Sequence, residues 1–271
     1  DEGGDTEEAS DPDAAVLSEV AGLFDRLRTD GADVDETVEP TSGREPAPDR
    51  TDAAHSDGPM RIVDLEVFEL RDRVLLPVTN QGLRSVKRRL MDHQNSALEE
   101  LRIDADGWAP PEDVIGDDLR PELEAIAHDS LAAGHEAAEA LVGVELPPLE
   151  TTPTIPVDAF VGPLVAALNQ TLTDGRESGE GDRQLSAAVS RVFRVWRTDQ
   201  AERRVRRLSL EWYHRGLVAG MGAAGHENLS WRVAGRGCAT CREHGSERAA
   251  TAIPPAHADC ECTLAPLVAV R

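Results

Sequence analysis

All four cysteines of the chain lie close together near its C-terminal end. They form two pairs, Cys238 with Cys241 and Cys260 with Cys262, and His257 lies three residues before the second pair. Structural zinc sites usually take four nitrogen or sulfur ligands, commonly as two close pairs from separate loops. The spacing therefore predicts a small zinc-ribbon-like α+β module over residues 229–271.

The expected ligands are Cys238, Cys241 and Cys260, with either Cys262 or His257 in the fourth place. A Cys-x-Cys pair is tighter than the usual Cys-x2-Cys, which favours replacement of one thiol by His257. Two disulfides, or free and redox-active thiols, are the alternatives that the sequence leaves open. A complete set of four ligands would leave no coordination position for a water molecule, so we do not expect metal-assisted hydrolysis.

Acidic residues are concentrated at the N-terminal end. The 271-residue chain has a formal net charge of −23, and residues 1–60 carry 18 acidic side chains against four arginines. This stretch is also rich in Gly, Pro, Ser and Thr, so it cannot bury enough apolar area to offset the entropy of ordering. We predict a disordered acidic tail.

One stretch of this tail, residues 14–28, has a helical pattern. It places Leu17, Val20, Phe24 and Leu27 on one stripe of a helix. The segment is either a docking peptide for a partner or a transient helix without one.

Helical periodicity begins at residue 61 and predicts a mainly α body. We expect one helical unit over 61–146, a proline-rich linker over 147–156, and a second helical unit over 157–228. Prolines suggest the helix boundaries, because proline lacks the N–H of an interior helical residue. The first helix should kink or restart at Pro77, and a second should run from Pro121, in its first turn, to about Leu141.

The second unit should begin with a helix over 157–172 that is broken or bent near Gly162-Pro163. A glycine-rich loop over 173–182 and one long helix from Gln184 should follow. Gly216, Gly220, Gly222 and Gly225 then favour close helix packing and a helix end, and residues 229–233 favour a short strand.

Basic side chains gather in two places on these helices. The first cluster is Arg84, Lys87, Arg88 and Arg89, and the second is Arg197, Arg203, Arg204, Arg206 and Arg207, between Trp196 and Trp212. Arginine beside aromatic rings can stack on bases, which allows weak nucleic-acid contact through Arg84, Lys87, Arg88, Arg203 and Arg204. Ordinary solvated helix faces are the simpler interpretation, because the net charge disfavours general nucleic-acid binding.

Catalytic motifs are lacking in the sequence, and we expect no enzyme. Neither His-Glu-x-x-His nor Gly-x-Ser-x-Gly occurs, and a Cys241–His244 pair would have no identifiable orienting residue. His128 and His135, seven residues apart, are interpreted as core or surface polar positions rather than ligands. No apolar run is long enough to span a membrane, and we expect a cytoplasmic location, or the virion if a phage encodes the chain.

The C-terminal motif resembles the end of the phage Mu F-like head morphogenesis family, in which Cys-x2-Cys is followed by Pro-Pro-x-His and Cys-Arg-Cys. The matching residues are Cys238, Cys241, Pro254, Pro255, His257, Cys260 and Cys262. Glu261 stands where that family usually has Arg, and Ala258 where it usually has Pro. The resemblance covers residues 212–271 and begins at the run Trp212 to Gly216.

Two upstream stretches, 86–95 and 194–197, more loosely resemble actinobacterial proteins with the same ending, some of which carry a DivIVA-like cell-division label. The resemblance to the phage family, whose members are often found in prophages, implies a non-enzymatic minor capsid protein with capsid or portal proteins as partners. The alternative is a host cell-division scaffold or adaptor that recruits partners through its acidic tail. An enzyme that uses the cysteine module is the third hypothesis.

Overall fold

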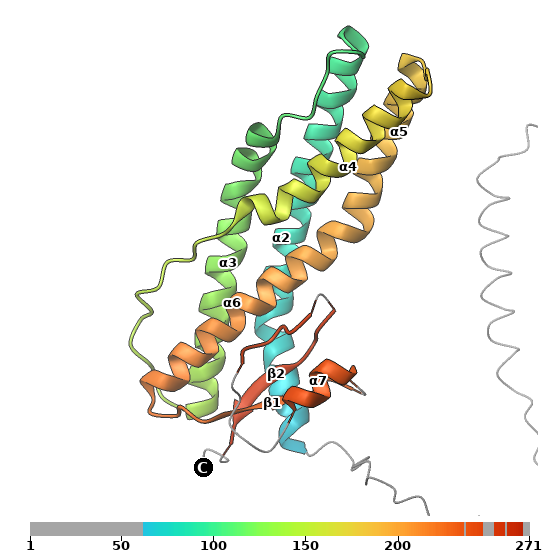
Figure 1. The fold of residues 1–271 in the computed structure, drawn as a ribbon. Helices are drawn as coiled ribbons and strands as arrows, with labels where there is room; N and C mark the ends of the chain where they lie inside the picture. Colours follow the sequence, from blue (N-terminus) through green and yellow to red (C-terminus); the bar gives the residue numbers. More distant parts are fainter. Residues whose placement is uncertain (1–61, 236, 246–251, 258, 268–271) are drawn as a thin grey trace, which may run out of the picture. The chain divides into compact units, whose positions relative to one another are not determined.

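The computed structural model describes residues 62–235, 237–245, 252–257 and 259–267. The expected acidic tail, with its segment 14–28, lies outside the described residues. The described part is mainly α-helical, as predicted (Figure 1). Its helices are α2 (Ile62–Ile103), α3 (Glu112–Val142), α4 (Val157–Glu177), α5 (Asp182–Val195), the π-helical turn η1 (Trp196–Gln200), α6 (Ala201–Ala223) and α7 (Ala239–His244).

Two prolines that were expected to set helix boundaries lie inside helices. Helix α2 continues through Pro77, and α3 begins at Glu112, before Pro121, with Pro111 at its N-cap. The predictions of a restart at Pro77 and of a helix start at Pro121 are therefore wrong. Burial explains both, because buried apolar side chains lie on each side of the proline, and their burial offsets the loss of one backbone hydrogen bond. These side chains are Leu75 and Val86 in α2, and Leu119 and Leu123 in α3.

The second helical unit also differs from its prediction. Helix α4 passes through Pro163 without a break and ends at Glu177, inside the segment expected to be a loop. The long helix expected from Gln184 begins at Asp182, and the π-helical turn η1 divides it into α5 and α6. Residues from both sides of the 147–156 connector form one hydrophobic core, which includes Val86, Leu123, Leu168, Phe193 and Val205.

Helices α3 and α6 approach each other closely at glycines. A Cβ atom built on Gly134 would lie 1.9 Å from the carbonyl oxygen of Tyr213, and one built on Gly216 would lie 2.0 Å from that of Leu131. The prediction that these small residues allow close helix packing is confirmed for Gly216 and Gly220. Gly222, by contrast, faces open space, and Gly225, with φ +79°, follows the end of α6.

The C-terminal segment adds a two-stranded antiparallel sheet and the short helix α7. Strand β1 (Leu229–Arg232), which was predicted, pairs with β2 (Thr263–Pro266), and Trp231 lies opposite Leu264. Figure 1 shows this segment beside the N-terminal part of α2. The residues on its inner side share a second hydrophobic cluster with the helices: Leu75, Leu210, Tyr213, Leu217, Met221, Trp231, Cys241, Cys260, Cys262 and Leu264.

Candidate metal centre

The first two cysteines are positioned by a glycine turn and the start of α7. Gly237 has φ +52°, a left-handed conformation that side chains disfavour, and it turns the chain into the helix. Cys238 is the N-cap of α7, and its Sγ accepts a hydrogen bond from the backbone N–H of Cys241 at 3.4 Å. The turn thus directs both thiols to the same side.

The other three candidate ligands come from the segment that leads into β2. The backbone N–H of Cys260 donates to the carbonyl oxygen of His257 at 3.2 Å, which folds this segment into a turn. Cys262 directly precedes β2, whose pairing with β1 carries the segment back toward α7.

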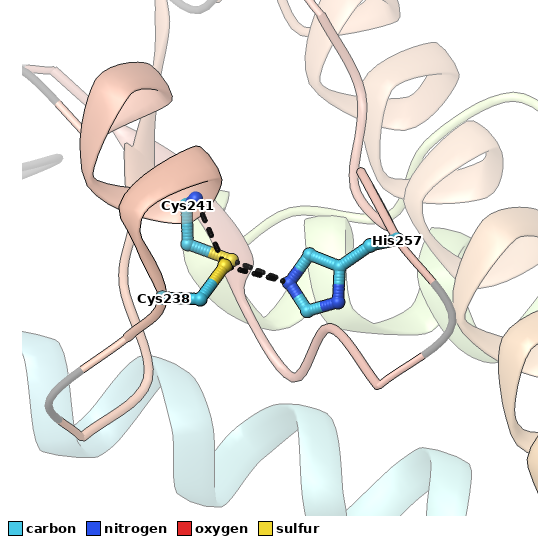
Figure 2. A group of neighbouring side chains, drawn as sticks. All are labelled: Cys238, Cys241 and His257. Carbon is cyan, nitrogen blue, oxygen red and sulfur yellow. Dashed lines mark hydrogen bonds between the residues drawn. The ribbon is translucent and has the colours of Figure 1, made fainter.

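The structure brings all five predicted ligands together as two groups of three that share Cys241. His257 Nε2 lies 3.1 Å from Cys238 Sγ and 3.0 Å from Cys241 Sγ (Figure 2). Cys241 Sγ lies 3.8 Å from Cys260 Sγ, and Cys262 completes the second group. All four cysteines are free thiols in this arrangement, so neither disulfide of the alternative prediction is formed.

These distances are close to those that one zinc ion requires. Zinc–sulfur bonds of about 2.3 Å at a tetrahedral centre place two sulfurs roughly 3.8 Å apart, which is the Cys241–Cys260 distance. A sulfur and an imidazole nitrogen should be about 3.6 Å apart, so ion binding would move the His257 ring outward by about half an ångström. Thiolate and imidazole donors suit zinc, and the cluster can therefore hold a metal ion of this kind.

The thiols do not titrate independently. The thiol of Cys262 donates to Cys260, which lowers the pKa of Cys260 to about 5 and raises the pKa of Cys262. Burial raises the pKa of Cys241 to about 11, whereas the backbone N–H of Cys241 lowers the pKa of the exposed Cys238. A bound cation would be needed to keep all these sulfurs ionised, and its binding would release protons.

Glu261, between the last two cysteines, links the cluster to the helical body. Its backbone carbonyl accepts a hydrogen bond from Arg71 of α2, and its carboxylate accepts one from Arg206 of α6 at 3.0 Å. Arg71 is in turn oriented by Asp72, at 2.6 Å from its Nη2, and lies over the ring of Phe68. These contacts left no signal in the sequence, because Arg71 and Arg206 are too distant along the chain from Glu261 to form a local pattern with it.

A buried histidine lies behind β2 and was also missed by sequence reasoning. His214 of α6 is fully buried, and its Nε2 lies 3.3 Å from Oγ1 of Thr263. Burial lowers the pKa of His214 to about 3, so the ring is neutral near pH 7. His244, which lies close to Cys241 in the sequence, stacks on Trp231 with ring centroids 4.8 Å apart.

The other two histidines that the sequence raised as candidate ligands lie away from this cluster. His128 is exposed beside Asp129, and Nε2 of His135 lies 3.0 Å from the carbonyl oxygen of Pro147. Among the residues that the structure describes, neither belongs to a group of potential metal ligands. Both occupy polar positions, as interpreted from the sequence.

Several arginines of the basic clusters are engaged with neighbouring groups of the protein. Arg89 pairs with Glu122 at 3.1 Å and Arg203 with Asp199 at 2.9 Å. Trp196 and Trp212 are both buried, so neither ring projects from the helix surface as a platform for bases, although Trp212 forms part of the wall of a cavity. These contacts favour the solvated-face interpretation of the arginines.

Comparison of the chain with protein-family models, curated proteins and solved structures finds no match. The likeness to the head morphogenesis family consequently rests on the C-terminal motif itself.

Proposed function

We propose that this protein is a non-enzymatic assembly protein of the phage head morphogenesis type, whose C-terminal module binds one structural zinc ion. The observation that supports the metal role is the meeting of four thiols and one imidazole from two separate segments around the shared Cys241. The assembly role is supported by the order of these same residues, which is the order of the family motif.

In this proposal the ion stabilises a segment that has little regular structure of its own. Strands β1 and β2 have four residues each and α7 has six, and isolated elements of this size are marginal in water. The ion would join the α7 turn to the segment before β2. Because Glu261 contacts both α2 and α6, the same ion would also hold the module on the helical body.

The metal content of protein purified without added metal tests the first half of the proposal. We expect about one zinc per chain, and removal by a chelator should lower the melting temperature, because structural zinc is linked to folding. Cys241→Ser should lose the ion, since both ligand groups include that thiol. His244→Asn, on the same short helix, is the matched control and should keep it. A metal-free protein whose melting is unchanged by a chelator would refute the zinc role.

The neighbouring genes test the assembly role independently of zinc. Portal and terminase genes beside this one would support a minor capsid function, with the protein in the cytoplasm during assembly or in the virion. A chromosome without such neighbours would contradict it. The cell-division alternative depends on the acidic tail, which lies outside the described residues.

A further inference from the structure

A cavity of about 470 Å³ lies between the N-terminal part of α4 and the middle of α6, and is separate from the cysteine module. Residues from the connector before α4 form one side of it. Its apolar lining includes Ile155, Phe160, Leu208 and Trp212. This volume and this kind of lining are typical of sites for small organic molecules.

Three arginines and one glutamate supply the charge around the cavity, an excess of two positive charges in a strongly acidic protein. Arg215 lies over the ring of Trp212 at 4.4 Å and pairs with Glu211 at 2.5 Å. Glu211 is the single carboxylate of the lining, and it is already paired with Arg215. The other two arginines, Arg204 and Arg207, are left without an anionic partner there.

Arg204 is fixed in place by contacts that do not neutralise it. Its Nη1 donates to the carbonyl oxygen of Ala159 at 3.0 Å, and its guanidinium lies 4.9 Å from the centre of the Trp196 ring. Burial lowers the pKa of Arg204, and the nearby positive charge of Arg207 lowers it further. Within the described part of the chain, Arg207 makes no ion pair. Two like charges thus face one cavity whose single carboxylate, that of Glu211, is paired with Arg215.

We propose that this cavity binds a small organic anion that has an apolar, ring-like body. Its carboxylate, sulfonate or phosphate group pairs with Arg207 and Arg204, because guanidinium groups match the geometry of such anions. Its apolar body lies against Phe160 and Trp212. The site is independent of the zinc module and of the assembly role.

Fluorescence titration of the full chain with 8-anilinonaphthalene-1-sulfonate tests this proposal, since that probe combines a sulfonate with flat rings. Arg207→Gln should weaken binding by about threefold to tenfold, the range expected for loss of a partly exposed charged contact. Arg88→Gln is the matched control, because it removes an exposed arginine from the middle of α2, away from the cavity, and should leave the affinity unchanged.

A second variant blocks the site without removing any packing contact. Ala159→Glu places a carboxylate beside Arg204, at an exposed position in the first turn of α4 where an acidic residue is favourable. It should weaken binding at least as much as Arg207→Gln. Equal affinities of wild type, Arg207→Gln and Ala159→Glu would overturn the proposal, as would an equal loss in Arg88→Gln.

A competition assay then tests whether binding requires both the anionic group and the apolar body of the ligand. 2-Naphthoate should displace the probe, whereas inorganic phosphate at the same concentration should not, because it lacks the apolar body. Displacement by both to the same extent would show a site for simple anions and would contradict the proposed class of ligand.

Discussion

The contact between α3 and α6 at Gly216 allows a sharp test of how the helical body is held together. In Gly216→Ala the new Cβ would lie 2.0 Å from the carbonyl oxygen and 2.9 Å from the carbonyl carbon of Leu131. Ordinary contacts need at least about 3 Å, so the two helix backbones must separate by about 1 Å at this point. Overpacking of this kind costs up to about 3 kcal/mol, and the higher helix propensity of alanine offsets about 1 kcal/mol of it. We therefore expect a net loss of about 2 kcal/mol in the free energy of unfolding.

Gly222→Ala, on the same helix, should have the opposite effect. A Cβ at Gly222 meets no atom within 4 Å, so only the helix propensity changes, and we expect a gain of about 0.5 kcal/mol near the end of α6. Urea unfolding followed by far-ultraviolet circular dichroism measures both free energies. If the two variants were equally stable, the close approach of α3 and α6 at Gly216 would be refuted.

Two further predictions concern the contacts that hold the module on the helices. Arg71→Met should lower the free energy of unfolding by about 1–3 kcal/mol, because it leaves the carbonyl of Glu261 without its buried donor. Glu261→Gln should cost less than about 0.5 kcal/mol, because its ion pair with Arg206 is exposed. Urea unfolding compares the two, and a larger loss for Glu261→Gln would contradict this ranking. The pKa of His214 is lower in the folded than in the unfolded chain, so its contribution to stability is complete above about pH 6.5 and falls as the pH drops toward 3. Lowering the pH from about 7 to about 5 should therefore cost about 2 kcal/mol of folding free energy through His214. This part of the pH dependence should disappear in His214→Leu and remain in the control variant His128→Leu.

Much of the helical body could be predicted from periodicity. Val86 and Leu90 of α2, and Leu185 and Val189 of α5, are pairs of buried apolar residues four positions apart, which is helical spacing. A helix restart at Pro77, a helix start at Pro121 and a break at Pro163 are not found, because the cost of a proline inside a helix is local and known, whereas the burial that offsets it comes from other helices. The π-helical turn at Trp196 likewise left no signal in the spacing of apolar residues.

The candidate site was predicted in its composition but not in its arrangement. Close spacing identified the five candidate ligands, because residues a few positions apart on a turn must lie near one another. The shared position of Cys241 depends on the pairing of β1 with β2, which joins segments that are far apart in the sequence. The contacts of Glu261 with Arg71 and Arg206 depend on the same long-range packing.

The sequence alone determined that this chain is mainly helical and that its C-terminal end carries a cluster of Cys and His residues that could hold a metal ion, since helical periodicity and the spacing of these residues are local properties. The tertiary structure decided which prolines the helices tolerate, where α3 and α6 touch through glycine, and how α2 and α6 hold the ligand segment. It also decided that three arginines and two aromatic rings meet around one cavity. These features depend on which distant segments pack together, and the burial that decides this packing is a property of the whole fold.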